Sequence, residues 1–263
     1  MSTMTLAVRD STTMLRRQLR HTSRNLSMTL MLLAVPIIFL LLFVYVLGGT
    51  LGDGLGGGSG GRGAYVNYVT PGILLITIAG AVQGTAISVA MDMTQGIIAR
   101  FRTMAIARVS VLTGHVLGSV SQILFQLTVV LGVAVLVGFR PNGTAIEWLA
   151  AAGVLTATAF ALVWLAVAMG LATKTVEAAS NLPMPLTLLP FFGSGFVPTD
   201  SLPVGLRWFA EYQPFTPIME TLRGLLLGTP IGNSAVIALG WCAVIGLVGY
   251  VWAKRLYNRD RTR

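Results

Sequence analysis

Six apolar runs, each bounded by charged or glycine-rich segments, constrain this 263-residue chain more than any single motif does. They cover residues 28–47, 69–91, 111–139, 148–171, 178–197 and 234–252. As an α-helix, about 20 residues cross a hydrocarbon core of about 30 Å. Charged residues make up only 10% of the chain, against about 25% in soluble domains. The sequence therefore predicts an all-α, polytopic membrane protein, a single domain over residues 1–263 with six transmembrane helices.

The distribution of basic side chains predicts how these helices cross the membrane. With a cytoplasmic amino terminus, fourteen of the 18 Lys and Arg residues fall in cytoplasmic segments, and four fall outside: Arg62, Arg140, Arg207 and Arg223. This asymmetry follows the positive-inside rule. We therefore expect a multi-pass protein of the cell (plasma or inner) membrane with both termini in the cytoplasm. The net charge of +9 then reflects cytoplasmic loops, and no nucleic acid is expected as a partner.

Residues 1–27 are basic and amphipathic. Val8, Leu15, Leu19 and Leu26 fall roughly on one helical face, and the other face carries arginines: Arg9, Arg16, Arg17, Arg20 and Arg24. This pattern predicts an interfacial helix on the cytoplasmic leaflet, with membrane lipid as its partner. A cleaved signal peptide fits less well, because the apolar run that follows is too long and no small-residue cleavage site closes it.

Glycine dominates residues 48–63, where ten of sixteen positions are Gly. A phosphate-binding loop is excluded because no Gly-Lys-Ser/Thr follows and no strand precedes it. We expect a flexible external loop. In the second apolar run, Gly80, Gly84 and Ser88 are spaced by four, which predicts a small-residue face for close helix contact.

Residues 92–108 form a polar, basic segment between the second and third runs. Apolar side chains recur there at spacings of three and four: Ile97, Ile98, Phe101, Met104 and Ala105. This spacing predicts a short amphipathic helix at the cytoplasmic surface, able to dock a soluble partner. The candidate docking residues are Asp92, Gly96, Ile97, Arg100, Phe101, Arg102, Met104 and Arg108.

The third run is uncharged but carries polar side chains on one helical face: His115, Ser119, Gln122 and Gln126. In a bilayer such a face should look toward protein or a water-filled space rather than lipid. Hydrogen bonding between helices is the favoured interpretation, because Ser and Gln are common packing residues in membrane helices. A translocation path is the alternative.

Prolines mark the fifth run and the segment after it. Pro183, Pro185 and Pro190 predict a kinked or partly unwound span. Residues 198–233 add five more prolines and several aromatic residues, and their amphipathic helix from Pro217 to Gly228 is too short to span. We therefore expect an external re-entrant helix hairpin. Its candidate gate residues are Pro214, Phe215, Pro217, Glu220 and Arg223, with Glu220 and Arg223 spaced to pair on one face.

The sequence offers no catalytic, cofactor-binding or metal-binding motif. Its acidic, His and Cys residues lack metal-ligand spacing, and neither a nucleophile elbow nor a His-Glu-x-x-His motif occurs. The single cysteine, Cys242, lies in an apolar run and is expected to pack there. No Walker A loop occurs, so a transport role needs an energy source on another chain. A membrane-embedded enzyme or a secondary transporter is less favoured, since no buried acidic residue and no inverted repeat is visible.

Two local motifs carry a family resemblance. Asp92, Gly96, Arg100-Phe101-Arg102 and Ile106-Ala107-Arg108 are similar to a cytoplasmic loop of one family, although Ala105 replaces a common proline. The segment Gln213-Pro214-Phe215-Thr216-Pro217, followed by Glu220, Arg223 and Gly228, is similar to its Asn-Pro-aromatic segment, with Gln213 in place of Asn. With the six runs, the whole chain resembles the membrane subunit (permease) of ABC-2 type exporters, particularly the daunorubicin and multidrug branch.

This resemblance implies a transporter subunit rather than an enzyme. The expected partners are a second permease copy, in a homodimer or heterodimer, and two ATP-binding cassette ATPase subunits. ATP and Mg²⁺ would bind the ATPase, and no cofactor is expected on this chain. The helix at 94–107 would dock into the ATPase, and the permeases would alternate access. The expected cargo is a hydrophobic drug, natural product or lipid-like molecule; export of a polysaccharide or lipid-linked glycan is the alternative.

Overall fold

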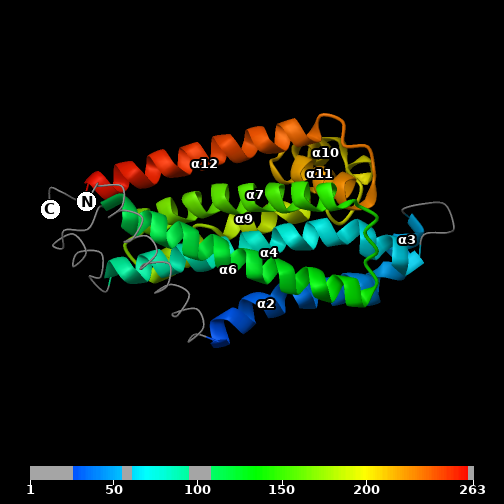
Figure 1. Ribbon diagram of the computed structural model, residues 1–263, viewed down its shortest axis with the longest axis horizontal. Helices are drawn as coiled ribbons and strands as arrows, with labels where there is room; N and C mark the ends of the chain where they lie inside the picture. Colours follow the sequence, from blue (N-terminus) through cyan, green and yellow to red (C-terminus); the bar gives the residue numbers. More distant parts are fainter. Residues whose placement is uncertain (1–25, 55–60, 95–107, 260–263) are drawn as a thin grey trace.

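A computed structural model describes residues 26–54, 61–94 and 108–259, and within these ranges every regular element is a helix. Five helices are long and apolar enough to cross a membrane (Figure 1). The first is built from α2 (Leu26–Leu41), a π-helical segment η1 (Leu42–Leu47) and α3 (Gly48–Gly54). The others are α4 (Gly61–Thr94), α6 (Arg108–Val137), α7 (Ala145–Ala172) and α12 (Ser234–Arg259).

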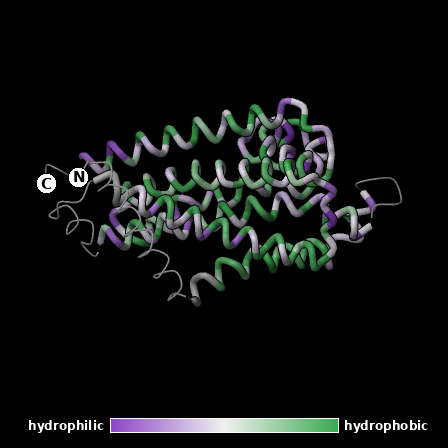
Figure 2. The backbone as a smooth tube through the Cα atoms, viewed as in Figure 1, coloured by the Kyte–Doolittle hydropathy of each residue, from purple (hydrophilic) through white to green (hydrophobic). Residues whose placement is uncertain are grey.

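Helices α4 and α7 form the centre of the bundle. In the most apolar stretch of each, 72% and 78% of the residues are buried, against 17% in α12 and 22% in the first helix. The exposed residues of α12 are mostly large and apolar, including Val236, Ile237, Leu247 and Val248. Apolar residues cover most of the helix lengths, and polar residues gather toward the two ends of the bundle (Figure 2). This distribution is that of a multi-pass membrane protein.

The predicted fifth span is a chain of short helices rather than one long helix. It consists of α8 (Val176–Asn181), α9 (Met184–Leu188) and a 3₁₀ turn η2 (Leu189–Phe192), followed by irregular backbone to Val197. The breaks fall around Pro183 and just after Pro190, since proline supplies no amide hydrogen and clashes with the preceding turn. The expected kinked or unwound segment is therefore confirmed, whereas a sixth long helix is not found among the described residues.

This broken segment runs along α4. Gln83 Nε2 donates a hydrogen bond of 2.7 Å to the Ser180 carbonyl, and Gly72 lies against Gly195. Gln83 and Gly72 are eleven residues apart, which is about 16 Å along an α-helix. The segment therefore follows α4 over about half of a bilayer core.

The bundle has two distinct ends. At one end, here called the hairpin end after the predicted hairpin, α4, α7 and α12 begin and α6 ends, beside three short helices, η3 (Thr199–Ser201), α10 (Val204–Tyr212) and α11 (Phe215–Leu227) (Figure 1). At the basic end, α4, α7 and α12 end and α6 begins; Lys254 and Arg255 lie there. The predicted interfacial helix of residues 1–27 and most of the predicted coupling loop lie outside the described residues.

Two expectations about glycine are wrong. Residues 48–54 are not a flexible loop but continue the first helix as α3, because packing against α4 orders them: a Cβ at Gly52 would overlap the carbonyl of Gly61. Gly80 does not make a close helix contact, since a Cβ there would meet nothing within 4 Å. Close backbone approaches that involve α4 occur instead at Gly72, against Gly195, and at Gly170 of α7, where a Cβ would lie 2.6 Å from the Ala86 carbonyl oxygen.

Candidate functional site

Helix α11 organises the hairpin end. Pro214 occupies its N-cap and Pro217 its first turn, where the missing amide hydrogen of proline costs nothing. The helix ends at Gly228, whose left-handed backbone (φ 72°) lets its N–H bond to the Gly224 carbonyl. Phe215 and Pro217 are buried. The predicted gate residues therefore lie on a helix that is packed into the bundle.

Arg223 joins α11 to α4 and to the irregular segment. Its Nη2 donates hydrogen bonds to the Ser194 carbonyl at 2.8 Å and to the Tyr68 carbonyl at 3.4 Å. Its Cζ lies 4.0 Å from the centroid of the Tyr68 ring, a cation–π contact. Burial lowers the pKa of Arg223, and neighbouring Tyr68 and Glu220 oppose this shift. Arg223 is therefore a largely buried cation stabilised by carbonyl oxygens and an aromatic face.

Two further backbone groups of the irregular segment bond to side chains of other elements. The Ser194 N–H donates to Thr216 Oγ1 at 3.3 Å, and the Tyr65 hydroxyl donates to the Phe196 carbonyl at 3.3 Å. Irregular backbone at membrane depth needs such partners because lipid offers none. Side chains of α4 and α11 thus replace the hydrogen bonds that a helix would have supplied here.

Glycine allows these three elements to meet. A Cβ on Gly72 would lie 3.0 Å from both the Cα and the carbonyl oxygen of Gly195. A Cβ on Gly193 would lie 2.7 Å from Gln213 Nε2, and one on Gly195 would lie 2.8 Å from Met219 Sδ. At Gly72 a side chain would meet backbone, so close packing there depends on the absence of a Cβ, whereas at Gly193 and Gly195 the ends of the Gln213 and Met219 side chains would have to move.

The expected pairing of Glu220 with Arg223 is not present among the ion pairs of the described residues. Glu220 Oε2 instead accepts a hydrogen bond of 2.8 Å from the Ser234 hydroxyl at the start of α12. Spacing along one helix made the pair possible, but Arg223 turns toward the buried carbonyls and Tyr68. Glu220 remains close enough to raise the pKa of Arg223.

Several buried polar atoms of this junction have no hydrogen-bond partner. They are Arg223 Nε, Ser194 Oγ, and both amide atoms of Gln213. Ser194 and Gln213 are each only 4% exposed. An unpartnered buried polar group costs about 1–3 kcal/mol, so packing alone does not account for this cluster.

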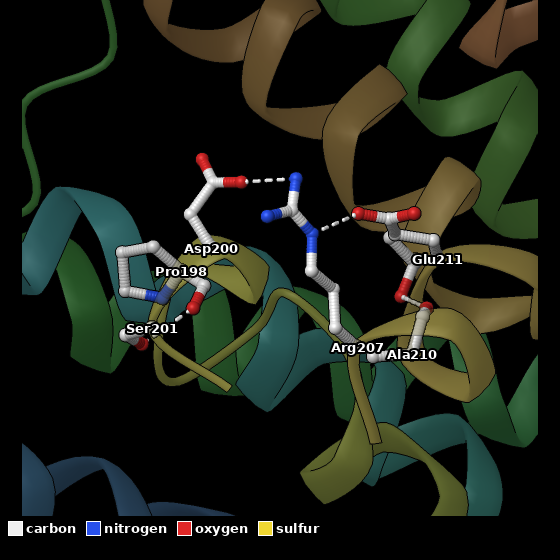
Figure 3. Close-up of polar contacts among 7 residues, drawn as sticks. Pro198, Asp200, Ser201, Arg207, Ala210 and Glu211 are labelled. Carbon is white, nitrogen blue, oxygen red and sulfur yellow. Dashed lines mark hydrogen bonds and ion pairs between the residues drawn. The ribbon is translucent and has the colours of Figure 1, made fainter. Parts of the chain in front are cut away.

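The outer part of the hairpin is held by exposed ion pairs (Figure 3). Arg207 Nη2 lies 2.6 Å from Asp200 Oδ1, and Arg207 Nε donates to Glu211 Oε1 at 2.8 Å. Because the three side chains are well exposed, this network adds little stability. Val204, Trp208 and Tyr212 are exposed at a spacing of four on the same helix, the composition of a membrane-interface surface.

At the basic end, residues from two separate predictions meet. Asp92, near the end of α4, was predicted to dock a partner, and His115 of α6 to line a path or pack. His115 Nε2 lies 3.0 Å from Asp92 Oδ2. Arg108 begins α6. The remaining docking candidates lie outside the described residues: Gly96, Ile97, Arg100, Phe101, Arg102 and Met104.

The polar face of α6 lies mainly inside the bundle. His115, Ser119 and Gln126 are buried, and Gln122 is half-buried. The Gln126 side chain is fully buried and neither of its amide atoms has a partner. The contact of His115 with Asp92 agrees with the packing interpretation, whereas the Gln126 side chain has no such partner. A translocation path along this face stays a prediction.

Sequence reasoning missed Tyr65, Tyr68, Ser194 and Thr216. A signal existed for three of them. Ser194 stands between two glycines, four residues after the last of three prolines, where an unwound backbone needs hydrogen-bond partners. Tyr65 and Tyr68 stand three residues apart at the start of α4 and so share a face. In the parts of the chain that the structure describes, no group of His, Cys, Asp or Glu could hold a metal ion.

The long apolar helices, with a broken segment along α4 and short helices at one end, define a multi-pass membrane protein. Residues 10–227 match the family model for ABC-2 type transporters. The chain belongs to this ABC-2 type transporter family and is a membrane permease subunit.

Three relatives illustrate the similarity. The chain is 26% identical over 191 residues to the probable doxorubicin resistance ABC transporter permease protein DrrC of Mycobacterium tuberculosis, a match that covers 72% of this chain and 69% of that protein. It is 26% identical over 186 residues to the daunorubicin resistance ABC transporter permease protein DrrB1 of Streptomyces coeruleorubidus, covering 70% and 65%. It is 28% identical over 169 residues to ABC transporter G family member 20 of Dictyostelium discoideum, covering 62% of this chain and 22% of that protein.

Proposed function

We propose that this chain is the membrane-spanning subunit of an ATP-driven exporter that moves a hydrophobic drug, natural product or lipid-like molecule out of the cell. The observation that carries the proposal is its similarity, over most of its length, to permeases named for doxorubicin and daunorubicin resistance. A separate ATP-binding cassette subunit hydrolyses ATP with Mg²⁺, since this chain has no Walker A loop.

In this proposal the basic end faces the cytoplasm and the hairpin end faces outward. The support is the charge distribution. In this orientation fourteen of the 18 Lys and Arg residues fall in segments on the cytoplasmic side, in agreement with the positive-inside rule. The segment 92–108 contacts the ATPase, and a second permease copy completes the transport pathway. Membrane lipid surrounds the bundle and contacts the amino-terminal helix.

The test co-expresses the chain with its cognate ATPase in a drug-sensitive host and follows accumulation of doxorubicin by its fluorescence. We expect accumulation to fall only when the ATPase is catalytically active. Phe101→Asp should abolish export and stimulation of ATPase activity at unchanged membrane abundance, because a charge replaces the apolar anchor of the docking stripe. Thr103→Asp is the matched control, since it places the same charge on the opposite face of the predicted helix.

Reconstituted vesicles distinguish cargo classes. ATP-dependent movement of doxorubicin or of a fluorescent phospholipid supports the proposal. Movement of a lipid-linked glycan alone would assign the chain to polysaccharide export. If no cargo moves and the ATPase neither binds nor responds to the chain, the proposal is wrong.

A further inference from the structure

Residues Gly193–Phe196 form a short link that is anchored by two aromatic side chains, Phe191 shortly before it and Phe196 at its end. Phe191 stacks on Phe196 with ring centroids 5.0 Å apart, and both rings contact the first helix, Phe191 through Phe39 at 5.4 Å and Phe196 through Phe43 at 4.6 Å. Between the two anchors stands Ser194, flanked by Gly193 and Gly195. Glycine permits the widest backbone motion, so the link is the part of this segment best able to change conformation.

The link is held by side chains rather than by regular secondary structure. Thr216 binds the Ser194 N–H and Arg223 binds the Ser194 carbonyl, and both of these side chains come from α11. Each bond can therefore break without unfolding a helix. A few side-chain hydrogen bonds therefore keep this link in place, and each can break and re-form.

Arg223 has an alternative partner within reach. Its hydrogen bonds run to the carbonyl oxygens of Ser194 and Tyr68 and its guanidinium lies over the Tyr68 ring, while the Glu220 carboxylate stands one helical turn earlier on α11. A carboxylate binds a guanidinium more strongly than a carbonyl does. Glu220 is itself held by the Ser234 hydroxyl of α12. Arg223 thus has two possible acceptors, the Ser194 carbonyl that it binds here and the Glu220 carboxylate on its own helix, and a switch requires two such arrangements.

We propose that Tyr68, Ser194 and Arg223 form a latch on the outer gate of the exporter, closed in this structure and opened when Arg223 moves from the Ser194 carbonyl to Glu220. The inference rests on the proposed function and deepens it. Tyr68 of α4 and Ser194 of the broken segment become positioning residues for export. The unpartnered Ser194 hydroxyl and Gln213 amide become exposed to cargo or water when the link moves.

The test replaces Ser194 by Cys in a Cys242→Ala background. The thiol takes the place of a hydroxyl that has no partner, and it reports on the link itself. Vesicles are treated with a charged methanethiosulfonate reagent that cannot cross the membrane, and the labelling rate is measured. With a catalytically inactive ATPase we expect slow labelling, because Ser194 is 4% exposed.

The first comparison loosens the latch at rest and needs no transport. Adding Tyr68→Leu or Arg223→Lys should raise the labelling rate about tenfold, since either change removes the stacked contact that holds the link. Arg207→Gln is the matched control, because Arg207 is an arginine of the same hairpin whose contacts lie with Asp200 and Glu211. Unchanged labelling in both Tyr68→Leu and Arg223→Lys, in protein of normal membrane abundance, would overturn the latch.

The second comparison uses the active ATPase and measures export in the same vesicles. We expect ATP to raise the labelling of Ser194→Cys and Glu220→Gln to remove that rise. Labelling that ignores ATP while export proceeds would overturn the latch and leave the proposed function intact. Absence of export by the unmodified chain would overturn the proposed function, while the resting comparison would still decide whether Arg223 and Tyr68 hold the link.

Discussion

His115 Nε2 and Asp92 Oδ2 lie 3.0 Å apart and join α6 to the last turns of α4. Their side chains are only 8% and 16% exposed, so water screens the contact little. The contact closes the base of the two helices that bear the predicted ATPase-docking segment. If that segment docks the ATPase, we expect its displacement to move α4 and α6 together rather than either helix alone.

Breaking this contact should destabilise the protein. We expect His115→Ala to cost about 1–3 kcal/mol and Asp92→Asn to cost less, because the first removes and the second weakens a contact between two largely buried polar side chains. The unfolding midpoint of the purified protein in detergent measures the loss. His115→Gln, which keeps a hydrogen-bond donor, should recover part of it. Asp200→Asn, at an exposed ion pair, should leave the midpoint unchanged; an equal fall there would argue against a special role for Asp92.

Gln126 should tolerate an apolar replacement. Its side chain is fully buried with no partner for either amide atom, so Gln126→Leu is expected to stabilise the protein by about 1–3 kcal/mol. Thermal unfolding in detergent tests the sign. Reduced export by a more stable Gln126→Leu variant would indicate that the amide contacts cargo. Stability and export that both remain normal would favour a packing role.

A thiol at Gln122 tests the same helix face for access. Gln122 is half-buried, and if it lines a path we expect Gln122→Cys to react with a polar thiol reagent in a Cys242→Ala background. The background change is needed because Cys242 is the one native cysteine of the chain and would otherwise react with the same reagent. Complete protection at rest and during ATP hydrolysis would contradict the path and support packing.

Gly72 should be intolerant of any side chain. Gly72→Ala places a methyl group 3.0 Å from the backbone of Gly195, and we expect it to cost about 1–3 kcal/mol of stability through overpacking. Gly80→Ala on the same helix is the control, because a Cβ there meets nothing within 4 Å. Comparison of the two unfolding midpoints measures the contact. Equal midpoints would show that α4 and the broken segment do not approach closely.

Glu220 should affect transport more than ATP hydrolysis. Glu220→Gln keeps an oxygen for the Ser234 hydroxyl but removes the charge beside Arg223, so export should fall while ATPase activity is retained. Ser234→Ala removes the hydrogen bond to Glu220 but keeps its charge, so comparison with Glu220→Gln shows which of the two affects export. Exchange of the two charges, Glu220→Arg with Arg223→Glu, should not restore export, because an arginine at 220 does not occupy the place of Arg223 above Tyr68. Normal export by Glu220→Gln at equal abundance would remove Glu220 from the gate.

The sequence predicted what depends on local composition. Hydropathy located the helices to within a few residues at most ends, since a bilayer requires long apolar stretches, and the prolines located the broken segment. It could not predict the partner of Arg223. Spacing along one helix suggested Glu220. Tyr68 lies 155 residues away from Arg223, and no sequence pattern indicates that its ring contacts this arginine. Glycine content suggested a loop at 48–54, but helix packing decided the structure there.

The π-helical segment Leu42–Leu47 has a consequence for the first membrane helix. A π turn holds about one residue more than an α turn, and each residue turns an α-helix by about 100°. The side chains before and after the segment are therefore offset from each other around the helix axis, and one helical wheel cannot describe both. Deleting a single residue between 42 and 47 would remove this offset and rotate Gly52 away from Gly61. The extra residue of the π-helical segment therefore orients the glycines of α3 toward α4.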